Sequence, residues 1–286
     1  RSIVIAAGAR PVVPRLPGLD DVGYVTSDTM WTKFAKLESV PRRLVVLGGG
    51  PIGCELTQAF ARLGAFVTQV EMGPRLLIRE DDEVSREVEN SLRRDGVDIK
   101  TSHKAVRCER EGDHKHIVLE QVGGEEVRVE FDQLIVAIGR SARLTGYGLE
   151  DLGIPTSRTV VTNEYLETLY PNIFAAGDVV GPYQFTHTAA HQGWYASVNA
   201  LFGHLKRFKV DYTTVPWTTF VDPEVARVGL SENEAREAGT PFEVTRYNLD
   251  ELDRAITDGA TQGFVKVLAP PGKDKILGVT IVGEHA

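Results

Sequence analysis

The stretch Val45–Leu56, VVLGGGPIGCEL, joins an apolar run to a helical pattern through a glycine-rich turn. Gly48, Gly50 and Gly53 stand in G-x-G-x-x-G spacing, and the next apolar run, AFVTQVE, ends in Glu71. A strand, a glycine turn, a helix and an acid at the end of the following strand form the context that a dinucleotide-binding motif requires. The sequence therefore predicts an α/β domain with a parallel sheet that binds a dinucleotide, although a turn that serves tight packing alone is the alternative.

Each glycine has its own role in such a turn. Gly48 permits the tight bend, Gly50 lets backbone approach a pyrophosphate at the helix N-terminus, and Gly53 allows the helix to pack closely on the strand. The intervening residues are candidates for the same contact: Gly49, Pro51 and Ile52. Glu71 can accept hydrogen bonds from both hydroxyls of the adenosine ribose and would repel a 2′-phosphate, which favours NAD over NADP. Arg75 nearby leaves NADP open.

Composition narrows the class of partner. The 286 residues carry a net charge of −8, and acidic and basic residues are interspersed, which argues against nucleic acid or an anionic membrane. Cys54 and Cys108 are too few and too far apart for a disulfide framework or a zinc site, so we expect no metal centre and a reducing, cytoplasmic setting. Cys54 has no cysteine three to five residues away, which predicts a packed, inert thiol.

Other segments predict further elements. Residues 105–129 alternate polar and apolar side chains around two turn signals, which is typical of an antiparallel meander. Residues 2–7 and the run NIFAAGD predict two more buried strands, the second ending in Asp178. A helix is expected over about 188–201. From Tyr212 onward, runs of period two with one helix, SENEAREAG, predict an α+β unit.

Five ordered motifs carry a family resemblance: IVIAAGARPVVPRLPG (3–18), VVLGGGPIGCELTQAFARLGAFVTQVE (45–71), AIGRSARL (137–144), NIFAAGDV (172–179) and VPWTTFVDPEVARVGLSENEA (215–235). Together they resemble the FAD-dependent pyridine nucleotide-disulfide oxidoreductases (class I), and within that family the dihydrolipoamide dehydrogenases and mercuric reductases. The first motif has Ala7 and Ala9 where the family usually has Thr and Ser, and the third lacks the usual Pro-Asn.

The resemblance implies roles on the NAD side. Gly48–Gly53 would hold the NAD pyrophosphate and Glu71 the ribose, while Pro51 falls where a gating residue lies near the nicotinamide. Glu55 matches an acid close to the nicotinamide and flavin; alternatively it is a carboxylate that offsets the helix dipole. Gly139 would line the nicotinamide side.

On the flavin side, the resemblance implies that Asp178 binds a ribityl hydroxyl and that Gly8 lies in the same cofactor site. The stretch that would run along the isoalloxazine consists of Gln184, Phe185, Thr186 and His187. His187 has the alternative reading of a packing or helix-start histidine.

The resemblance also implies a domain plan. It consists of a segment of a flavin domain (1–40), a doubly wound NAD-binding domain with a parallel sheet and an antiparallel meander (41–140), a second flavin-domain segment (141–210) and an incomplete α+β dimer-interface domain (211–286). A homodimer through 212–286 is expected.

Three family features are missing from the sequence: the first G-x-G-x-x-G that cradles FAD, the C-x-x-x-x-C redox pair and the C-terminal His-Pro…Glu base. We therefore expect an internal piece of a longer enzyme, inactive alone, with the catalytic residues outside it. In the full-length enzyme, electrons would pass between NAD(P)H, FAD and a disulfide, lipoamide or similar acceptor. Such an enzyme would serve cell redox homeostasis. The alternatives are a stand-alone NAD-binding module without catalysis and a related flavoprotein with another acceptor, such as a quinone or peroxide.

Overall fold

The computed structural model describes residues 1–286 apart from residue 122. The chain folds into two units, each assembled from segments far apart in the sequence: residues 1–11 with 140–215, and residues 12–139 with 216–286.

The first unit contains short strands, a 3-10 turn and one long helix: β1 (Ile3–Ile5), β2 (Ala9–Pro11), β11 (Arg140–Ala142), β12 (Ile173–Ala175), η1 (Gly177–Val179) and α5 (Thr186–Phe202). β1 pairs in parallel with β12, and β2 pairs antiparallel with β11. Phe174 of β12 and Ala196 of α5 belong to one buried cluster, so α5 packs on the small parallel sheet. The turn η1 lies directly between β12 and α5 in the chain and carries Asp178.

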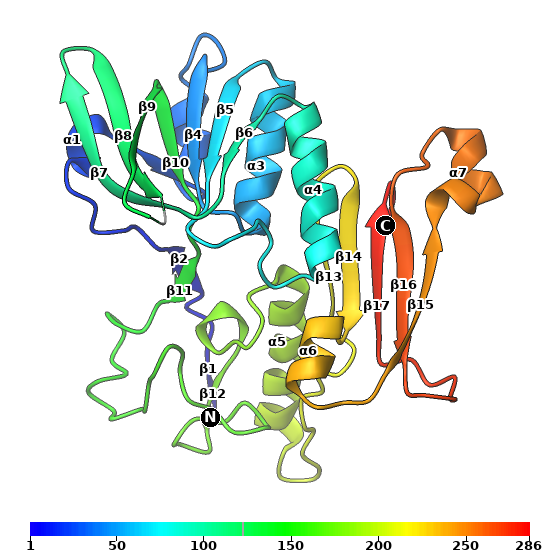
Figure 1. The fold of residues 1–286 in the computed structure, drawn as a ribbon. Helices are drawn as coiled ribbons and strands as arrows, with labels where there is room; N and C mark the ends of the chain where they lie inside the picture. The colour runs from blue at the N-terminus through cyan, green and yellow to red at the C-terminus, as the bar shows by residue number, and fades with distance from the viewer. Residues whose placement is uncertain (122) are drawn as a thin grey trace. The chain divides into compact units, whose positions relative to one another are not determined.

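The second unit is organised around a five-stranded sheet: β3 (Val25–Thr26), β4 (Arg43–Leu47), β5 (Phe66–Val70), β6 (Asp98–Lys100) and β10 (Gln133–Val136). Its order is β3-β10-β4-β5-β6 with every neighbouring pair parallel. Figure 1 labels β10, β4, β5 and β6 of this sheet. Parallel strands end at the same edge of a sheet, and a ligand binds beyond those ends. Gly48 after β4 and Glu71 after β5 therefore meet at one edge.

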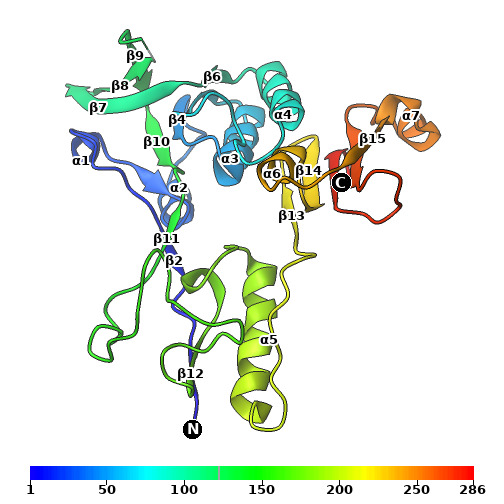
Figure 2. The ribbon, with the colours of Figure 1, turned by 60° about the horizontal axis from the view of Figure 1, so that its bottom comes forward.

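Alternating side chains of β4 build a core on each face of this sheet. The elements that cover the faces are α1 (Leu19–Val22), α2 (Met30–Phe34), α3 (Pro51–Arg62), β7 (His103–Glu111), β8 (His114–Gln121) and β9 (Glu126–Phe131). Val46 packs with Met30 and Phe60, so α2 and α3 cover one face. Val45 packs with Leu19 and Ile117, so α1 and the antiparallel meander β7-β8-β9 cover the other (Figure 2).

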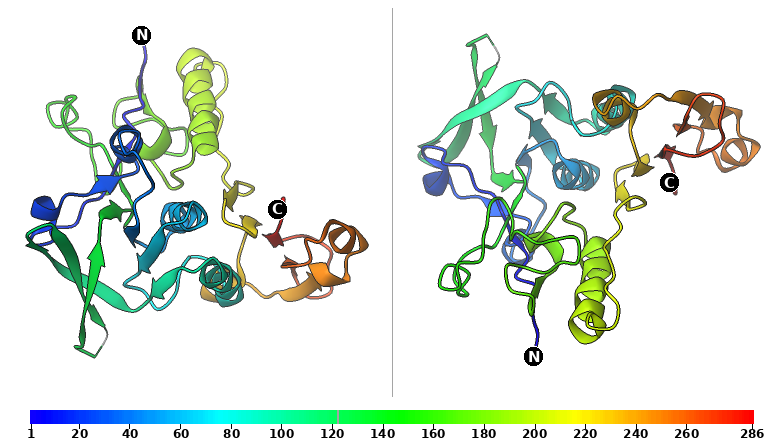
Figure 3. Two further views of the ribbon diagram at one scale, coloured as in Figure 1. Left: turned by 90° about the horizontal axis from the view of Figure 1, so that it is seen from above. Right: turned by 90° about the horizontal axis from the view of Figure 1, so that it is seen from below.

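The last part of the second unit is an antiparallel sheet with short helices: β13 (Pro216–Thr219), β14 (Glu224–Gly229), α6 (Glu232–Glu237), β15 (Glu243–Asn248), η2 (Leu249–Glu251), α7 (Asp253–Asp258), β16 (Phe264–Ala269) and β17 (Gly278–Gly283). The strand order is β13-β14-β17-β16-β15. Helix α4 (Asp82–Arg94) lies beside this sheet (Figure 3). Leu92 of α4 shares a buried cluster with Phe264 and Val282 of the antiparallel sheet and with Cys54 of α3.

The predicted fold class and the meander are confirmed, with differences in detail. The helix expected over 188–201 runs from Thr186 to Phe202, and α7 was not predicted because its six residues are too short for a helical period to register. Residues 12–40, which the sequence assigned to a flavin-domain segment, pack in the second unit instead, where β3 pairs with β10.

Candidate functional site

The glycine turn after β4 is held by close backbone contacts. Gly48 has φ +114°, a conformation that favours glycine, and its N–H donates to the carbonyl of Val70 at 2.8 Å. A Cβ on Gly48 would lie 2.3 Å from the Ala137 oxygen, and one on Gly53 would lie 2.1 Å from the Gly48 oxygen. Neither position can carry a side chain without moving the backbone, so these glycines set the shape of the turn.

Gly50 differs from its neighbours because a Cβ there would meet no atom within 4 Å. It is the N-cap of α3, with ordinary extended angles (φ −78°, ψ 179°), and Pro51 begins the helix. The first turn of a helix presents unpaired N–H groups and the positive end of its dipole, which suit an anionic group. The space beside the Gly50 backbone is therefore open, and Ile52 follows Pro51 in the same first turn. A phosphate contact here stays a prediction.

The Glu71 carboxylate is tied to the turn by both of its oxygens. Oε2 accepts the N–H of Gly49 at 2.7 Å, and Oε1 accepts the N–H of Gly73 at 2.6 Å. A carboxylate has about four lone-pair sites, so each oxygen can still accept a ligand hydroxyl. The acid that the sequence assigned to a ribose is thus oriented by the loop before any ligand arrives.

Arg75 is engaged within its own loop. Its Nη2 atom donates to the carbonyl oxygens of Ile78 (3.2 Å) and Glu80 (2.9 Å) and lies 3.1 Å from a carboxylate oxygen of Asp82. All of these contacts are made by Nη2, so they do not decide between NAD and NADP, and the preference for NAD stays a prediction.

Glu55 lies one turn into α3 and is half-buried. Burial raises the pKa of its carboxyl, and the hydrogen bond that Oε1 accepts from the Phe220 N–H at 2.8 Å offsets part of that rise. The carboxylate is therefore held to the segment after β13. Gly139 ends the segment 12–139 of the second unit. It has φ +126°, and a Cβ there would meet no atom within 4 Å.

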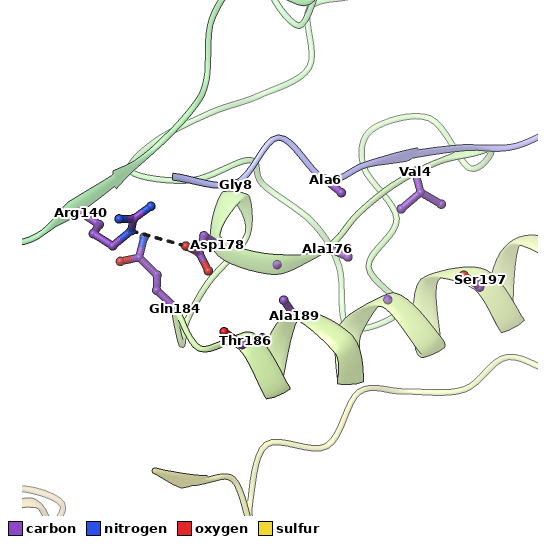
Figure 4. A pocket seen from close by; sticks show the side chains of 12 residues that line it. Val4, Ala6, Gly8, Arg140, Ala176, Asp178, Gln184, Thr186, Ala189 and Ser197 are labelled. Atoms are coloured by element: carbon purple, nitrogen blue, oxygen red, sulfur yellow. Dashed lines mark ion pairs between the residues drawn. The ribbon is translucent and has the colours of Figure 1, made fainter. Parts of the chain in front are cut away.

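A pocket of about 580 Å³ lies within the first unit. Its lining comprises Val4, Ala6, Gly8, Arg140, Ala176, Gly177, Asp178, Gln184, Thr186, Ala189, Gly193 and Ser197 (Figure 4). Small-molecule and cofactor pockets typically enclose about 300–1,000 Å³, so the volume suits a ligand. Four of the predicted flavin-side residues line it: Asp178, Gln184 and Thr186, which are close in the sequence, and Gly8, which is far from them.

Two features of this pocket were missed from the sequence. Arg140 faces Asp178, with Nε 3.8 Å from Oδ2, and its Nη2 donates to the Ala9 oxygen at 3.1 Å (Figure 4). Along α5, the small residues Ala189, Gly193 and Ser197 line the pocket. Their spacing of four residues places them on one helix face, a signal that the sequence did contain.

Phe185 and His187 are not among the lining residues of the pocket. Their rings stack on each other with centroids 5.3 Å apart and planes at 9°, and Phe185 also stacks on Tyr183 at 6.0 Å. Their proposed place along a flavin ring stays a prediction.

The cysteines lie in separate buried clusters of the second unit, Cys54 beside α4 and Cys108 in the meander. Burial raises the pKa of Cys54 to about 12 and that of Cys108 to about 11, so both are protonated thiols near neutral pH. Within the part of the chain that the structure describes, no cluster of His, Cys, Asp and Glu could hold a metal ion, and no helix is long and apolar enough to cross a membrane.

Comparison with known proteins identifies relatives of this chain. The family model of the pyridine nucleotide-disulphide oxidoreductases matches residues 1–193, and the model of that family's dimerisation domain matches residues 215–286. Mercuric reductase from Staphylococcus aureus is 39% identical over all of this chain and 51% of its own length. Dihydrolipoyl dehydrogenase from Thermus scotoductus is 34% identical over all of this chain and 61% of its own length. The chain thus spans about half the length of the curated relatives it matches.

Solved structures of proteins with similar folds belong to flavoprotein reductases and related proteins. The HOCl-induced flavoprotein disulfide reductase RclA from Escherichia coli, solved as a Cu(II) complex, matches with a TM-score of 0.87 and 30% identity, covering 100% of this chain and 64% of that one. LpdA from Mycobacterium tuberculosis matches with a TM-score of 0.85 and 27% identity, covering 99% and 60%. The chain belongs to the pyridine nucleotide-disulphide oxidoreductase family, whose members use FAD and NAD(P)H.

Proposed function

We propose that this chain is the central part of a flavin-dependent oxidoreductase that passes electrons between NAD(H) and a disulfide, lipoamide or mercuric acceptor through FAD. Two features of the structure support the proposal: the turn whose Gly49 N–H donates to Glu71, and the pocket of the first unit that Asp178 lines. A stand-alone NAD-binding module would need only the first of these.

The pocket of the first unit fits the flavin side of FAD. Bound FAD would supply a ring that accepts and returns a hydride equivalent. The Asp178 carboxylate would accept a hydrogen bond from a ribityl hydroxyl, beside the cation of Arg140. The wall of small residues on α5 leaves room for a planar group. Gly8 and the stretch Gln184–His187 would complete this side.

The turn of the second unit fits NAD. Gly48–Gly53 and the N-terminus of α3 would hold the pyrophosphate, and Glu71 would accept both ribose hydroxyls. Pro51, Glu55 and Gly139 would lie on the nicotinamide side. The raised pKa of Glu55 makes its carboxyl easier to protonate than an exposed one, so it could hold or donate a proton there.

The remaining assignments follow from family membership. Residues 41–140, joined by residues 12–40 in the second unit, would form the NAD domain. Residues 1–11 and 141–210 would contribute to the FAD domain, and residues 211–286 would begin the surface of a homodimer, which the dimerisation-domain match supports. The redox cysteines and the proton-transfer base would lie in other parts of the full enzyme, which would work in the cytoplasm in redox homeostasis. The 286-residue chain alone would be inactive.

The test is to express the complete reading frame that contains this chain. We expect a C-x-x-x-x-C motif in it, a purified dimer with flavin absorbance, and bleaching of that absorbance by NADH. The Asp178→Ala variant should lose flavin while its NADH binding survives, because the two sites lie in different units. A colourless wild-type protein that still binds NADH would instead support the binding-module alternative.

A further inference from the structure

Gln192 lies in α5 with 0% of its surface exposed, and its side chain both accepts and donates hydrogen bonds. Its Oε1 atom accepts the N–H of Gly177 at 2.6 Å. Its Nε2 atom donates to the Gly181 oxygen at 2.6 Å and to the Tyr212 hydroxyl at 2.8 Å. All of these groups belong to the first unit. The carboxamide therefore uses its acceptor and both of its donor hydrogens.

The two backbone partners stand at either end of the turn that carries Asp178. Gly177 has φ +81° and Gly181 has φ +72°, and both amide hydrogens at positions 180 and 181 donate to the Gly177 oxygen. A Cβ on Gly177 would come within 3.3 Å of the Ala189 side chain, so the turn rests directly on α5. Gln192 thus joins both ends of the turn to the helix that forms one wall of the pocket.

We propose that Gln192 is the positioning residue of the flavin site: its side-chain amide fixes the Gly177–Gly181 turn so that Asp178 is presented to the ribityl chain of FAD. The inference rests on the proposed function, because it takes the pocket to be the flavin site. Gln192 is not among the residues that line the pocket, so it acts through Asp178 and not by touching the cofactor.

The chemistry of the partners makes a carboxamide necessary. The Gly177 N–H needs an acceptor and the Gly181 carbonyl needs a donor. A glutamate of the same shape satisfies Gly177, but its second oxygen faces the Gly181 oxygen with lone pairs unless it carries a proton. Burial favours the neutral form of a carboxylic acid, so its pKa would lie above the usual value of about 4.3. The Gln192→Glu variant should therefore hold the turn when protonated and release it when ionised.

Asn199 provides a matched control on the same helix. It is 5% exposed, its Oδ1 accepts the Phe208 N–H at 2.8 Å, and its Nδ2 donates to the Phe208 and Tyr165 oxygens at 2.8 and 3.1 Å. It is a buried amide with the same use of donor and acceptor, but its partners lie away from the Asp178 turn. Asn199→Asp therefore reports the general effect of a buried carboxylate in α5.

The experiment measures the Kd of FAD for the full-length apoprotein by flavin fluorescence between about pH 5 and pH 9, with thermal melting of each sample. We expect Gln192→Glu to bind like the wild type at the acid end and about 10-fold or more weakly at the alkaline end. Gln192→Leu should be weak at every pH, and Asn199→Asp should melt earlier without a pH-dependent change in the FAD Kd. If Gln192→Leu does not fold, the FAD Kd of Gln192→Glu measured at the acid end of the pH range serves as the reference for a folded variant.

The outcomes separate the two proposals. A wild-type protein that fails to bind FAD at any pH overturns the proposed function and this inference with it. A wild type that binds FAD while Gln192→Glu shows the same Kd at every pH overturns the role of Gln192 alone. So does a pH-dependent FAD loss of equal size in Asn199→Asp, because the effect would then belong to any buried carboxylate in α5.

Discussion

The Glu71 carboxylate lies 2.7 Å from the Gly49 N–H, and its other oxygen lies 2.6 Å from the Gly73 N–H. The residue proposed to choose between NAD and NADP is therefore also the residue that holds the glycine turn to the loop after β5. A substitution at this position changes ligand contacts and loop geometry together. For this reason Glu71→Arg is not expected to convert the site cleanly to NADP, because an arginine cannot accept either backbone N–H.

Glu71→Ala should weaken NADH binding about 10- to 100-fold, since hydrogen bonds to charged groups contribute about 1.5–3 kcal/mol and about 1.4 kcal/mol corresponds to tenfold. NADPH binding should weaken less, so the preference for NADH shrinks. Fluorescence titration of both nucleotides measures the two constants.

The control for this change is Glu89→Ala. Glu89 reaches the same loop from α4, where its Oε1 accepts the Leu76 N–H at 3.1 Å. Loss of the Glu89 side chain should weaken the binding of NADH and NADPH alike, because it supports the loop and is not proposed to contact the ribose. Tighter binding of NADPH than NADH by the unsubstituted protein would refute the role of Glu71.

Gly50 and Gly53 should respond in opposite ways to alanine. A Cβ at Gly50 meets no protein atom within 4 Å, so Gly50→Ala should change stability by no more than about 0.5 kcal/mol. It should nevertheless abolish NADH binding, because the methyl group fills the space that a pyrophosphate needs. A Cβ at Gly53 would lie 2.1 Å from the Gly48 oxygen, so Gly53→Ala should cost more than about 2 kcal/mol. Urea unfolding and NADH titration check the pair, and a fully stable Gly53→Ala would contradict the structure.

Lys266 is 1% exposed and lies 2.6 Å from both Asp81 Oδ2 and Glu83 Oε1 and 3.1 Å from Glu232 Oε1. Burial lowers the pKa of Lys266, but the three carboxylates outweigh it and the net shift is upward. Burial likewise raises the pKa of Asp81, but hydrogen bonds from Lys266 and from two backbone N–H groups outweigh it and the net shift is downward. The network ties β16 and α6 to the start of α4.

These directions set the pH range in which the network stabilises the fold. The Asp81 contribution is present above its unfolded pKa of about 3.9 and is lost as pH falls through the lower folded value. The Lys266 contribution is full below its unfolded pKa of about 10.4 and is lost as pH rises through the higher folded value. Lys266→Met should cost about 3–5 kcal/mol at pH 7, because it leaves buried carboxylates without their cation.

That deficit should shrink as the solution is acidified towards about pH 4, where the carboxylates can take up protons. Urea unfolding at several pH values measures it. The exposed pair Arg254–Asp258, with side chains 81% and 46% accessible, is the control, and Arg254→Met should cost at most about 1 kcal/mol. An equal cost for the two substitutions would show that the buried network does not stabilise the fold.

The geometry of the glycine turn after β4 could be predicted from sequence because its determinants are local. Gly48, Gly50 and Gly53 follow a strand and begin a helix, and Glu71 ends the next strand, so the parallel sheet brings them to one edge once the strands pair. The side-chain bond between Glu71 and Gly73 was not predictable in the same way, because it depends on how the loop after β5 turns back.

The pocket of the first unit shows where prediction from sequence stops. Arg140 and Asp178 lie 38 positions apart by their numbers and meet only because β2 pairs with β11 and β1 pairs with β12. The placement of residues 12–40 was missed because β3 is two residues long, too short for a strand period to be visible. Gln192 could not be predicted, because two of its partners are backbone groups and the third, Tyr212, lies 20 positions away in the sequence.

The 286-residue chain by itself should be unable to reduce lipoamide, mercuric ion or any disulfide. The thiolate is the reactive form of cysteine, and the pKa values of about 12 for Cys54 and about 11 for Cys108 keep both protonated at pH 8. They lie in different buried clusters, so neither is placed to resolve a mixed disulfide formed by the other.

Labelling with an aromatic disulfide reagent at pH 8 tests the thiols directly. The folded chain should react slowly, and the same chain in denaturant should react at once at two sites, because unfolded cysteines return to a pKa of about 8.5. The matching activity assay follows NADH oxidation with lipoamide, mercuric ion and a small disulfide in turn. A chain that consumed NADH in step with disulfide reduction would show that one of these buried thiols takes part in turnover, and the proposal that the redox pair lies elsewhere in the full enzyme would fail.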